Sequence, residues 1–183
     1  LARLPELEEL WIGENEVTSL MPLAGLKNLK VLEAHNNQIF NMTPIGNLTQ
    51  LERLNLWNNK LSQIDAIRHC KQLKYLDLRE NNITEIIAVS GMSRLRFLLT
   101  ERNQIQDIEP LRTLVELEKL YLGRNRISDI SPLGSLRNLK DLRLAYNEIQ
   151  SVLPLASLGG IEFLELRNNR LADVTPLHSL NTL

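Results

Sequence analysis

The chain has 183 residues, a formal net charge of −1, 43% hydrophobic residues and 23% charged residues. This balance is typical of a folded globular protein, and it excludes the global basic field that attracts nucleic acids or anionic membranes. No apolar run approaches the ~18 residues of a membrane-spanning helix, and a single cysteine excludes a disulfide framework within these residues.

Leucine is in excess, with 39 residues, and this bias indicates an internal repeat. Asparagines recur every 22 residues without insertion or deletion, at Asn15, Asn37, Asn59, Asn81, Asn103, Asn125, Asn147 and Asn169. Eight repeats follow one another in a single array over 1–183, at 7–28, 29–50, 51–72, 73–94, 95–116, 117–138, 139–160 and 161–182. Since Leu1 aligns with Leu23 and Leu183 opens a ninth repeat, we expect a fragment of a longer chain.

Each repeat predicts the same elements in the same order, which the repeat 117–138 illustrates. Leu120 and Leu122 have the period of two expected of a short strand with one buried face. Asn125 then marks a turn, and the apolar residues after it lie three apart, which favours 3₁₀ turns or coil over an α-helix. Stacked repeats would bury a continuous core and pair their strands into one parallel sheet.

The frame resembles that of leucine-rich repeat proteins of the short, 22-residue class, along the whole chain. Six of the seven prolines share one position, and segments such as Asp107-Ile-Glu-Pro-Leu111 are similar to the internalin return. Ala66 and Ala88 replace this proline in two repeats. The resemblance implies an α/β-type leucine-rich repeat solenoid, with a curved parallel β-sheet on the concave face and 3₁₀ or coil returns on the convex face.

Two features that suggest catalysis have a structural interpretation. A repeated asparagine amide can pair with turn backbone that would otherwise be buried without a partner. Cys70 occupies a column filled elsewhere by Leu26 and Met92, so it is predicted to be a buried small hydrophobe. The sequence contains no nucleotide-binding, nucleophile-elbow or metal-ligand motif. We therefore predict no catalytic residue, no metal, no cofactor and no enzymatic activity.

The outward positions of the predicted sheet are the candidate binding surface. With the first leucine of each repeat as position 1, positions 3, 5, 7 and 8 point away from the core. Seven of the eight aromatic residues lie at these positions, and only Phe40 lies elsewhere. The predicted partner-binding residues are Trp11, Trp57, Tyr75, Arg79, Phe97, Leu99, Glu101, Arg102, Tyr121, Arg124, Arg143, Tyr146 and Phe163.

The same columns predict contacts between neighbouring repeats. Trp57 and Arg79 share a column and are expected to form a cation–π contact, while Tyr75 and Phe97 share another. Opposite charges share one position of adjacent repeats at Arg79–Glu101, Glu80–Arg102, Lys119–Asp141 and Arg143–Glu165. One interpretation is cross-strand pairing, which predicts four ion pairs, and the other is that these charges select the partner.

These patterns favour a non-enzymatic recognition module that binds a protein partner on its concave face. We expect no nucleic-acid partner and no membrane insertion by this segment. The internalin resemblance implies a bacterial surface or secreted protein. The alternatives are an intracellular scaffold similar to the leucine-rich regulatory subunit of type-1 protein phosphatase, the targeting array of a larger multidomain enzyme, and a designed consensus array. The uneven face argues against the last of these.

Overall fold

A computed structural model describes residues 4–180, in which each of eight repeats forms one short strand and one 3₁₀ helix. The strands are β1 (Glu9–Trp11), β2 (Val31–Glu33), β3 (Arg53–Asn55), β4 (Tyr75–Asp77), β5 (Phe97–Leu99), β6 (Lys119–Tyr121), β7 (Asp141–Arg143) and β8 (Phe163–Glu165). The 3₁₀ helices are η1 (Met21–Leu23), η2 (Thr43–Asn47), η3 (Asp65–His69), η4 (Ile87–Val89), η5 (Glu109–Leu111), η6 (Ser131–Ser135), η7 (Leu153–Ser157) and η8 (Thr175–Ser179).

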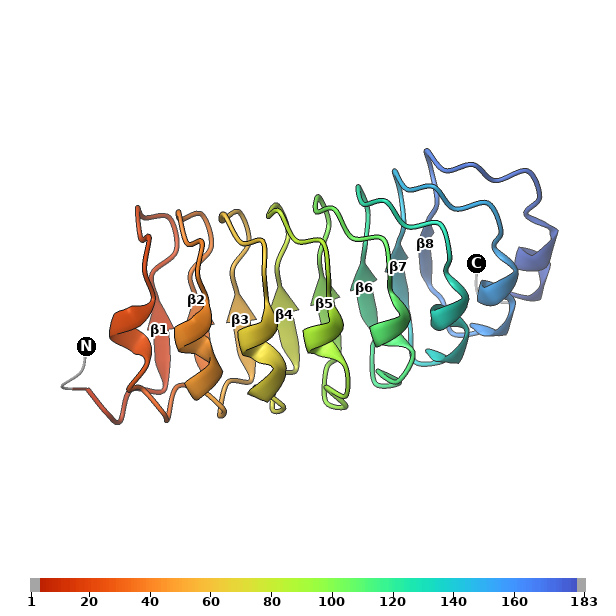
Figure 1. Ribbon diagram of the computed structural model, residues 1–183. Coiled ribbons are helices and arrows are strands. Elements are labelled where there is room, and N and C mark those ends of the chain that lie inside the picture. The colour runs from red at the N-terminus through yellow and green to blue at the C-terminus, as the bar shows by residue number, and fades with distance from the viewer. Residues whose placement is uncertain (1–3, 181–183) are drawn as a thin grey trace.

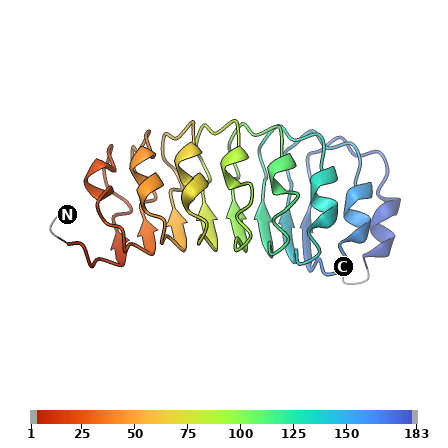
Figure 2. The same cartoon turned by 60° about the horizontal axis from the view of Figure 1, so that its bottom comes forward.

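The strands form one parallel sheet in sequence order, from β1 to β8. Every strand residue pairs with the residue 22 positions later, as Leu10 does with Leu32 and Leu32 with Leu54. The strands stand in one row and the 3₁₀ helices in another on the opposite side, joined by turns (Figures 1 and 2). The predicted solenoid, with a strand and a 3₁₀ return in each 22-residue repeat, is confirmed.

The core lies between the sheet and the row of 3₁₀ helices. Residues such as Leu54 and Leu76, at the central position of their strands, are fully buried in it. Thr100, the polar residue among the apolar columns, is also fully buried, and its Oγ1 lies 3.4 Å from the carbonyl oxygen of Tyr121. Leu10 and Leu164 are only partly buried, because within the described residues their repeats have a neighbour on one side alone.

The asparagine side chains pair with turn backbone, as predicted, and from Asn37 onward they also join each turn to the turn before it. Asn81 Nδ2 donates to the carbonyl oxygens of Leu78 in its own repeat (3.1 Å) and Leu56 in the preceding repeat (3.0 Å). Its Oδ1 accepts a hydrogen bond from the backbone N–H of Leu61 at 2.9 Å. The residue before each of these asparagines has a left-handed backbone, with φ of 52° at Glu80, so the side chain at that position turns outward from the sheet.

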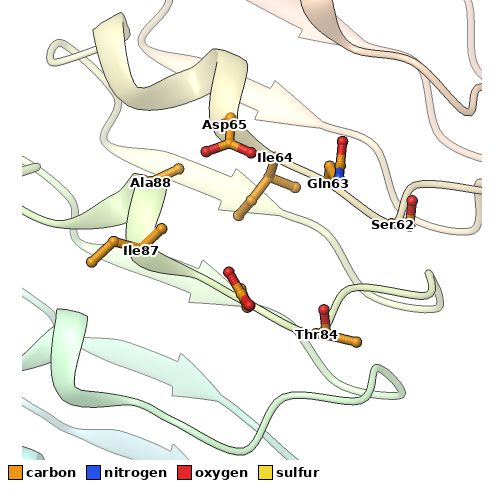
Figure 3. A pocket seen from close by; sticks show the side chains of 8 residues that line it. Ser62, Gln63, Ile64, Asp65, Thr84, Ile87 and Ala88 are labelled. Carbon is orange, nitrogen blue, oxygen red and sulfur yellow. The ribbon is translucent and has the colours of Figure 1, made fainter.

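The aspartate of the internalin-like return has a local role. Its carboxylate accepts a hydrogen bond of 2.8 Å from the backbone N–H two residues later, at Asp107, Asp129 and Asp173. Two neighbouring repeats instead have Gln63 and Glu85 there, with Ala66 and Ala88 in place of proline. A groove of about 130 Å³ opens between these two returns (Figure 3).

Cys70 is fully buried, as predicted, with its Sγ 3.6 Å from the carbonyl oxygens of Ile45 and Leu48. Burial raises the pKa of the thiol to about 11. Because the thiolate is the reactive form, we expect a disulfide reagent at pH 8 to label the folded protein at least about a hundredfold more slowly than the urea-unfolded protein. Equal labelling rates would show that Cys70 is accessible.

Candidate binding face

The outward side chains of the sheet and of the adjoining turns form one continuous surface, called here the concave face. Strand alternation directs position 4 of each repeat into the core and positions 3 and 5 outward, and the turn adds positions 7 and 8. Register without offset therefore stacks equivalent positions of successive repeats into columns that run along the array. All four columns bring aromatic and arginine side chains of adjacent repeats together.

Trp57 lies between His35 and Arg79 in the column at position 7. The Trp57 and His35 rings stack with their centroids 6.1 Å apart and their planes at 17°. The guanidinium carbon of Arg79 lies 5.3 Å from the centroid of the Trp57 ring, so the predicted cation–π contact is confirmed. Both neighbours restrict the indole, which remains partly exposed.

Asp77 holds Arg79 in this position. Arg79 Nη2 donates to Asp77 Oδ2 at 2.7 Å, and the backbone N–H of Arg79 donates to Oδ1 at 3.1 Å. The Tyr75 hydroxyl donates to Asp77 Oδ2 at 3.3 Å. Asp77 is 0% exposed, and the hydrogen bond that its carboxylate accepts from the guanidinium raises the pKa of Arg79. The buried carboxylate thus fixes two side chains of the concave face at once.

Tyr75 and Phe97 form the predicted contact in the column at position 3. Their ring centroids lie 6.1 Å apart at 42°. The guanidinium carbon of Arg53 lies 3.6 Å from the centroid of Tyr75, and Lys119 Nζ lies 6.0 Å from that of Phe97. In this column two adjacent rings therefore lie between a cation on each side, over four repeats.

A second cation–π group covers the sheet around β6 to β8. The guanidinium carbon of Arg143 lies 4.1 Å from the centroid of Tyr121 and 5.0 Å from that of Phe163. The hydroxyl of Tyr121 donates to Asp141, and burial together with this hydrogen bond raises the pKa of Tyr121 to about 12. Tyr146 is flanked by Arg124 at 4.1 Å and Arg167 at 5.2 Å.

The proposed binding residues differ in exposure. Trp57, Tyr75, Phe97 and Tyr121 are partly exposed and lie in adjacent repeats. Leu99 points to the same face but is 8% exposed, because the longer side chains around it cover it. Trp11 and Phe163, in the first and last repeats, are 66% and 48% exposed and lie apart from the central cluster.

Three of the four predicted cross-strand ion pairs are wrong. Arg102 and Glu80 do pair, at 3.4 Å. Arg79 and Arg143 instead pair with Asp77 and Asp141, two residues earlier in their own repeats. Within residues 4–180, Arg79–Glu101, Lys119–Asp141 and Arg143–Glu165 are not among the ion pairs. The arginine side chain is long enough to reach the carboxylate two residues earlier in its own repeat. Leaving a buried carboxylate without a partner costs more free energy than leaving an exposed one unpaired, so the buried carboxylate is the preferred partner.

The column at position 5 contains a buried polar row that the sequence interpretation missed. Glu33, Asn55 and Asp77 lie beneath the partly exposed side chains. Asn55 Nδ2 donates to Glu33 Oε2 at 2.6 Å, and Arg53 donates to the other Glu33 oxygen. The available signal was a polar residue at the same strand position in three consecutive repeats, flanked by arginines.

A hollow of about 330 Å³ opens on the concave face where the residues at position 7 have small side chains. Gly123 and Ala145 occupy that position in consecutive repeats, between Glu101 on one side and Arg167 on the other. Tyr146 and several arginines form its walls. Among residues 4–180, no group of three or more His, Cys, Asp or Glu side chains is placed to hold a metal ion.

A family model described as the leucine-rich repeat region matches residues 1–174. The chain belongs to the leucine-rich repeat family. Domains of this family are commonly protein-interaction modules. Over residues 4–180, no helix has the length and hydropathy needed to cross a membrane.

Several solved leucine-rich repeat structures are similar to this chain. Internalin C2 of Listeria monocytogenes has a TM-score of 0.93 and 37% identity, covering 96% of this chain and 77% of its own. A leucine-rich repeat protein of Leptospira interrogans has a TM-score of 0.93 and 28% identity, covering 100% of this chain and 48% of its own.

The plant peptide hormone receptor RGFR1, in complex with RGF2, has a TM-score of 0.83 and 26% identity, covering 93% of this chain and 30% of its own. This chain therefore spans about half of the Leptospira chain and about a third of the receptor chain. No curated protein sequence matches it significantly.

Proposed function

We propose that this leucine-rich repeat array is a non-enzymatic recognition module that binds a protein or peptide partner across its concave face. The observation that carries the proposal is the gathering of seven of the eight aromatic residues on that face, with Trp57 and Phe97 near its centre. Aromatic and arginine side chains dominate the energetics of protein interfaces, and exposed rings on a sheet are costly without a partner.

The cation–π contacts add a second argument, since they hold the rings in place before a partner arrives. Trp57 is fixed by His35 and Arg79, and Tyr75 by Arg53 and Phe97. A side chain that is already immobilised loses less conformational entropy on binding, so more of its contact energy appears as affinity. On the convex side of residues 4–180, the exposed large apolar side chains, such as Met21, Ile87 and Leu153, lie in different repeats.

The relatives support a partner of this class. The receptor RGFR1 is in complex with RGF2, and internalin C2 shares 37% identity with this chain. This identity favours the internalin-like interpretation, with placement at a bacterial surface or in the secreted fraction, over the phosphatase-regulator alternative. The concave face offers such a partner rings, arginines and carboxylates.

We expect Trp57→Ala or Phe97→Ala to weaken partner binding by at least ~2 kcal/mol, with little change in unfolding free energy, because both side chains are partly exposed anchors. The partner is recovered by affinity capture with the wild-type chain and titrated against each variant by calorimetry. The matched controls Arg68→Ala and Arg112→Ala remove exposed arginines of the convex side that pair only with Asp65 and Glu109. Loss of binding in these controls, with Trp57→Ala and Phe97→Ala unaffected, would contradict the proposal.

A further inference from the structure

The hollow at Gly123 and Ala145 contains two charged side chains that, unlike the other charged side chains around it, form no ion pair within residues 4–180. Four of its five arginines pair with carboxylates: Arg79 with Asp77, Arg102 with Glu80, Arg143 with Asp141, and Arg167 with Glu165. The fifth, Arg124, forms no ion pair within the described residues. Its guanidinium lies over the Tyr146 ring at 4.1 Å, which orients it and leaves its N–H groups without a carboxylate.

Glu101 is the carboxylate without a counterpart in the same hollow. It is partly buried, and over residues 4–180 its side chain has neither a hydrogen-bond donor nor an ion pair. Burial raises its pKa, although the charges of Arg79 and Arg143 act in the opposite direction. Its Oε1 lies 3.3 Å from where a Cβ on Gly123 would stand, so the missing side chain leaves the carboxylate open to the hollow.

The two unpaired charges lie on consecutive repeats, Glu101 at position 7 and Arg124 at position 8 of the next. The turns that carry them lie against each other, because the backbone N–H of Arg102 donates to the carbonyl oxygen of Gly123 at 2.9 Å. Standard backbone dimensions then place the Cα atoms of Glu101 and Arg124 within ~8 Å of each other. Side chains two residues apart on an extended peptide project on the same side at ~7 Å. One short extended segment can therefore reach both groups.

We propose that this hollow receives an extended segment of the partner protein in which a basic and an acidic side chain are separated by one residue, the basic group binding Glu101 and the acidic group binding Arg124. The inference rests on the proposed concave-face function and specifies the chemistry of the partner. Burying an unpaired charge is costly, so each group favours a ligand that supplies the opposite charge.

The balance of charge explains why the segment is mixed rather than purely acidic. The five arginines of the hollow are matched by Glu80, Glu101 and Glu165 on its walls and by Asp77 and Asp141 behind them. A segment with two acidic side chains would place one of them against Glu101, and a segment with two basic ones would place one against Arg124. Like charges in contact are a common basis for rejecting wrong partners.

The test uses an immobilised array of short synthetic peptides in a neutral host sequence, probed with the labelled wild-type chain. Each peptide carries two test residues separated by one residue. In the mixed arm these are one Lys and one Asp, in either order, and in the other three arms they are two Asp, two Lys or two Ser. We expect the mixed arm to bind at least about tenfold more tightly than the other three, a difference of ~1.4 kcal/mol, because it alone supplies an opposite charge to both groups. Equal or tighter binding of the two-Asp arm would mean a simple anion site and would overturn the proposal.

Variants with matched controls assign the effect to the two residues. Glu101→Gln and Arg124→Met should each weaken binding of the mixed peptides about tenfold, and Glu101→Lys should shift the preference to the two-Asp arm. Glu148→Gln and Arg170→Met change the same residue types at an exposed ion pair outside the hollow, and should have little effect. Equal losses from these controls would overturn the assignment.

Failure of this inference differs from failure of the proposed function. If Trp57→Ala weakens binding of the captured partner while Glu101→Gln and Arg124→Met leave it unchanged, the concave face binds but the hollow has no such ligand. If Trp57→Ala and Phe97→Ala leave partner binding intact, the proposed function itself fails, whatever the peptide array shows.

Discussion

Asn103→Ala is expected to lower the free energy of unfolding by roughly 3 kcal/mol, because one side chain satisfies buried backbone groups in two repeats. Asn103 Nδ2 donates to the carbonyl oxygens of Leu78 at 2.9 Å and Thr100 at 3.0 Å, and its Oδ1 accepts from the N–H of Ile83 at 2.9 Å. Alanine leaves these groups in an interior that water does not reach. Urea unfolding followed by circular dichroism measures the loss.

Two asparagines serve as controls for this prediction. Asn82→Ala removes an exposed amide one repeat earlier, and should change stability by less than ~0.5 kcal/mol. Asn15, in the first repeat, is exposed, and within residues 4–180 its side chain bonds the carbonyl oxygens of Ile12 and Gly13 alone, so Asn15→Ala should lie between the two. A loss at Asn103 no larger than that at Asn82 would show that the amide column does not hold the turns together.

Asp77→Ala is the second change with a large expected effect, a loss of roughly 2 to 3 kcal/mol in unfolding free energy. Removing one partner of a buried pair leaves the other charge without compensation. Arg79 and the Tyr75 hydroxyl both lose their acceptor, so Trp57 and Tyr75 should also become less ordered. Thermal and urea unfolding give the stability, and indole fluorescence anisotropy reports the mobility of the tryptophan side chains.

Glu165→Ala is the matched control, since the Glu165–Arg167 pair has the same spacing on a more exposed part of the face. Exposed ion pairs contribute ~0–1 kcal/mol, so this variant should lose far less. A double-mutant cycle of Asp77→Ala with Arg79→Ala isolates the pairwise energy. A coupling near zero would show that the buried carboxylate is stabilised by its other donors and not by Arg79.

The regular features of this molecule follow from the sequence because each is repeated at a fixed spacing. The two-residue period of Leu120 and Leu122 specifies a strand, and the recurrence of asparagine specifies a bonded turn. An atypical residue in one repeat does not obscure the pattern, because the other seven repeats show the same spacing. The inward direction of Cys70 follows in the same way, from the leucines in its column.

The details of the concave face depend on side-chain reach, which the period does not encode. Position 5 points outward at both Leu99 and Trp11, yet the first is covered and the second is largely exposed. Leu99 lies between repeats on both sides, whose longer side chains cover it, whereas Trp11 lies on the edge strand β1 and has a neighbouring strand on one side within the described residues. The ion pairs differ from prediction for a similar reason, since Arg143 has carboxylates both along and across the strands and reaches the one beside it, Asp141.

The constant pairing distance along the sheet has a consequence for how the chain folds. Parallel sheets usually form slowly, because segments far apart in the sequence must meet, with a loss of chain entropy, before any stabilising contact forms. Here each strand, as β1 with β2, needs only the strand that begins 22 residues further on. Every closure step is equally short, so folding can nucleate at any adjacent pair of repeats and spread in both directions. An all-parallel sheet thus forms with the kinetics of a local structure.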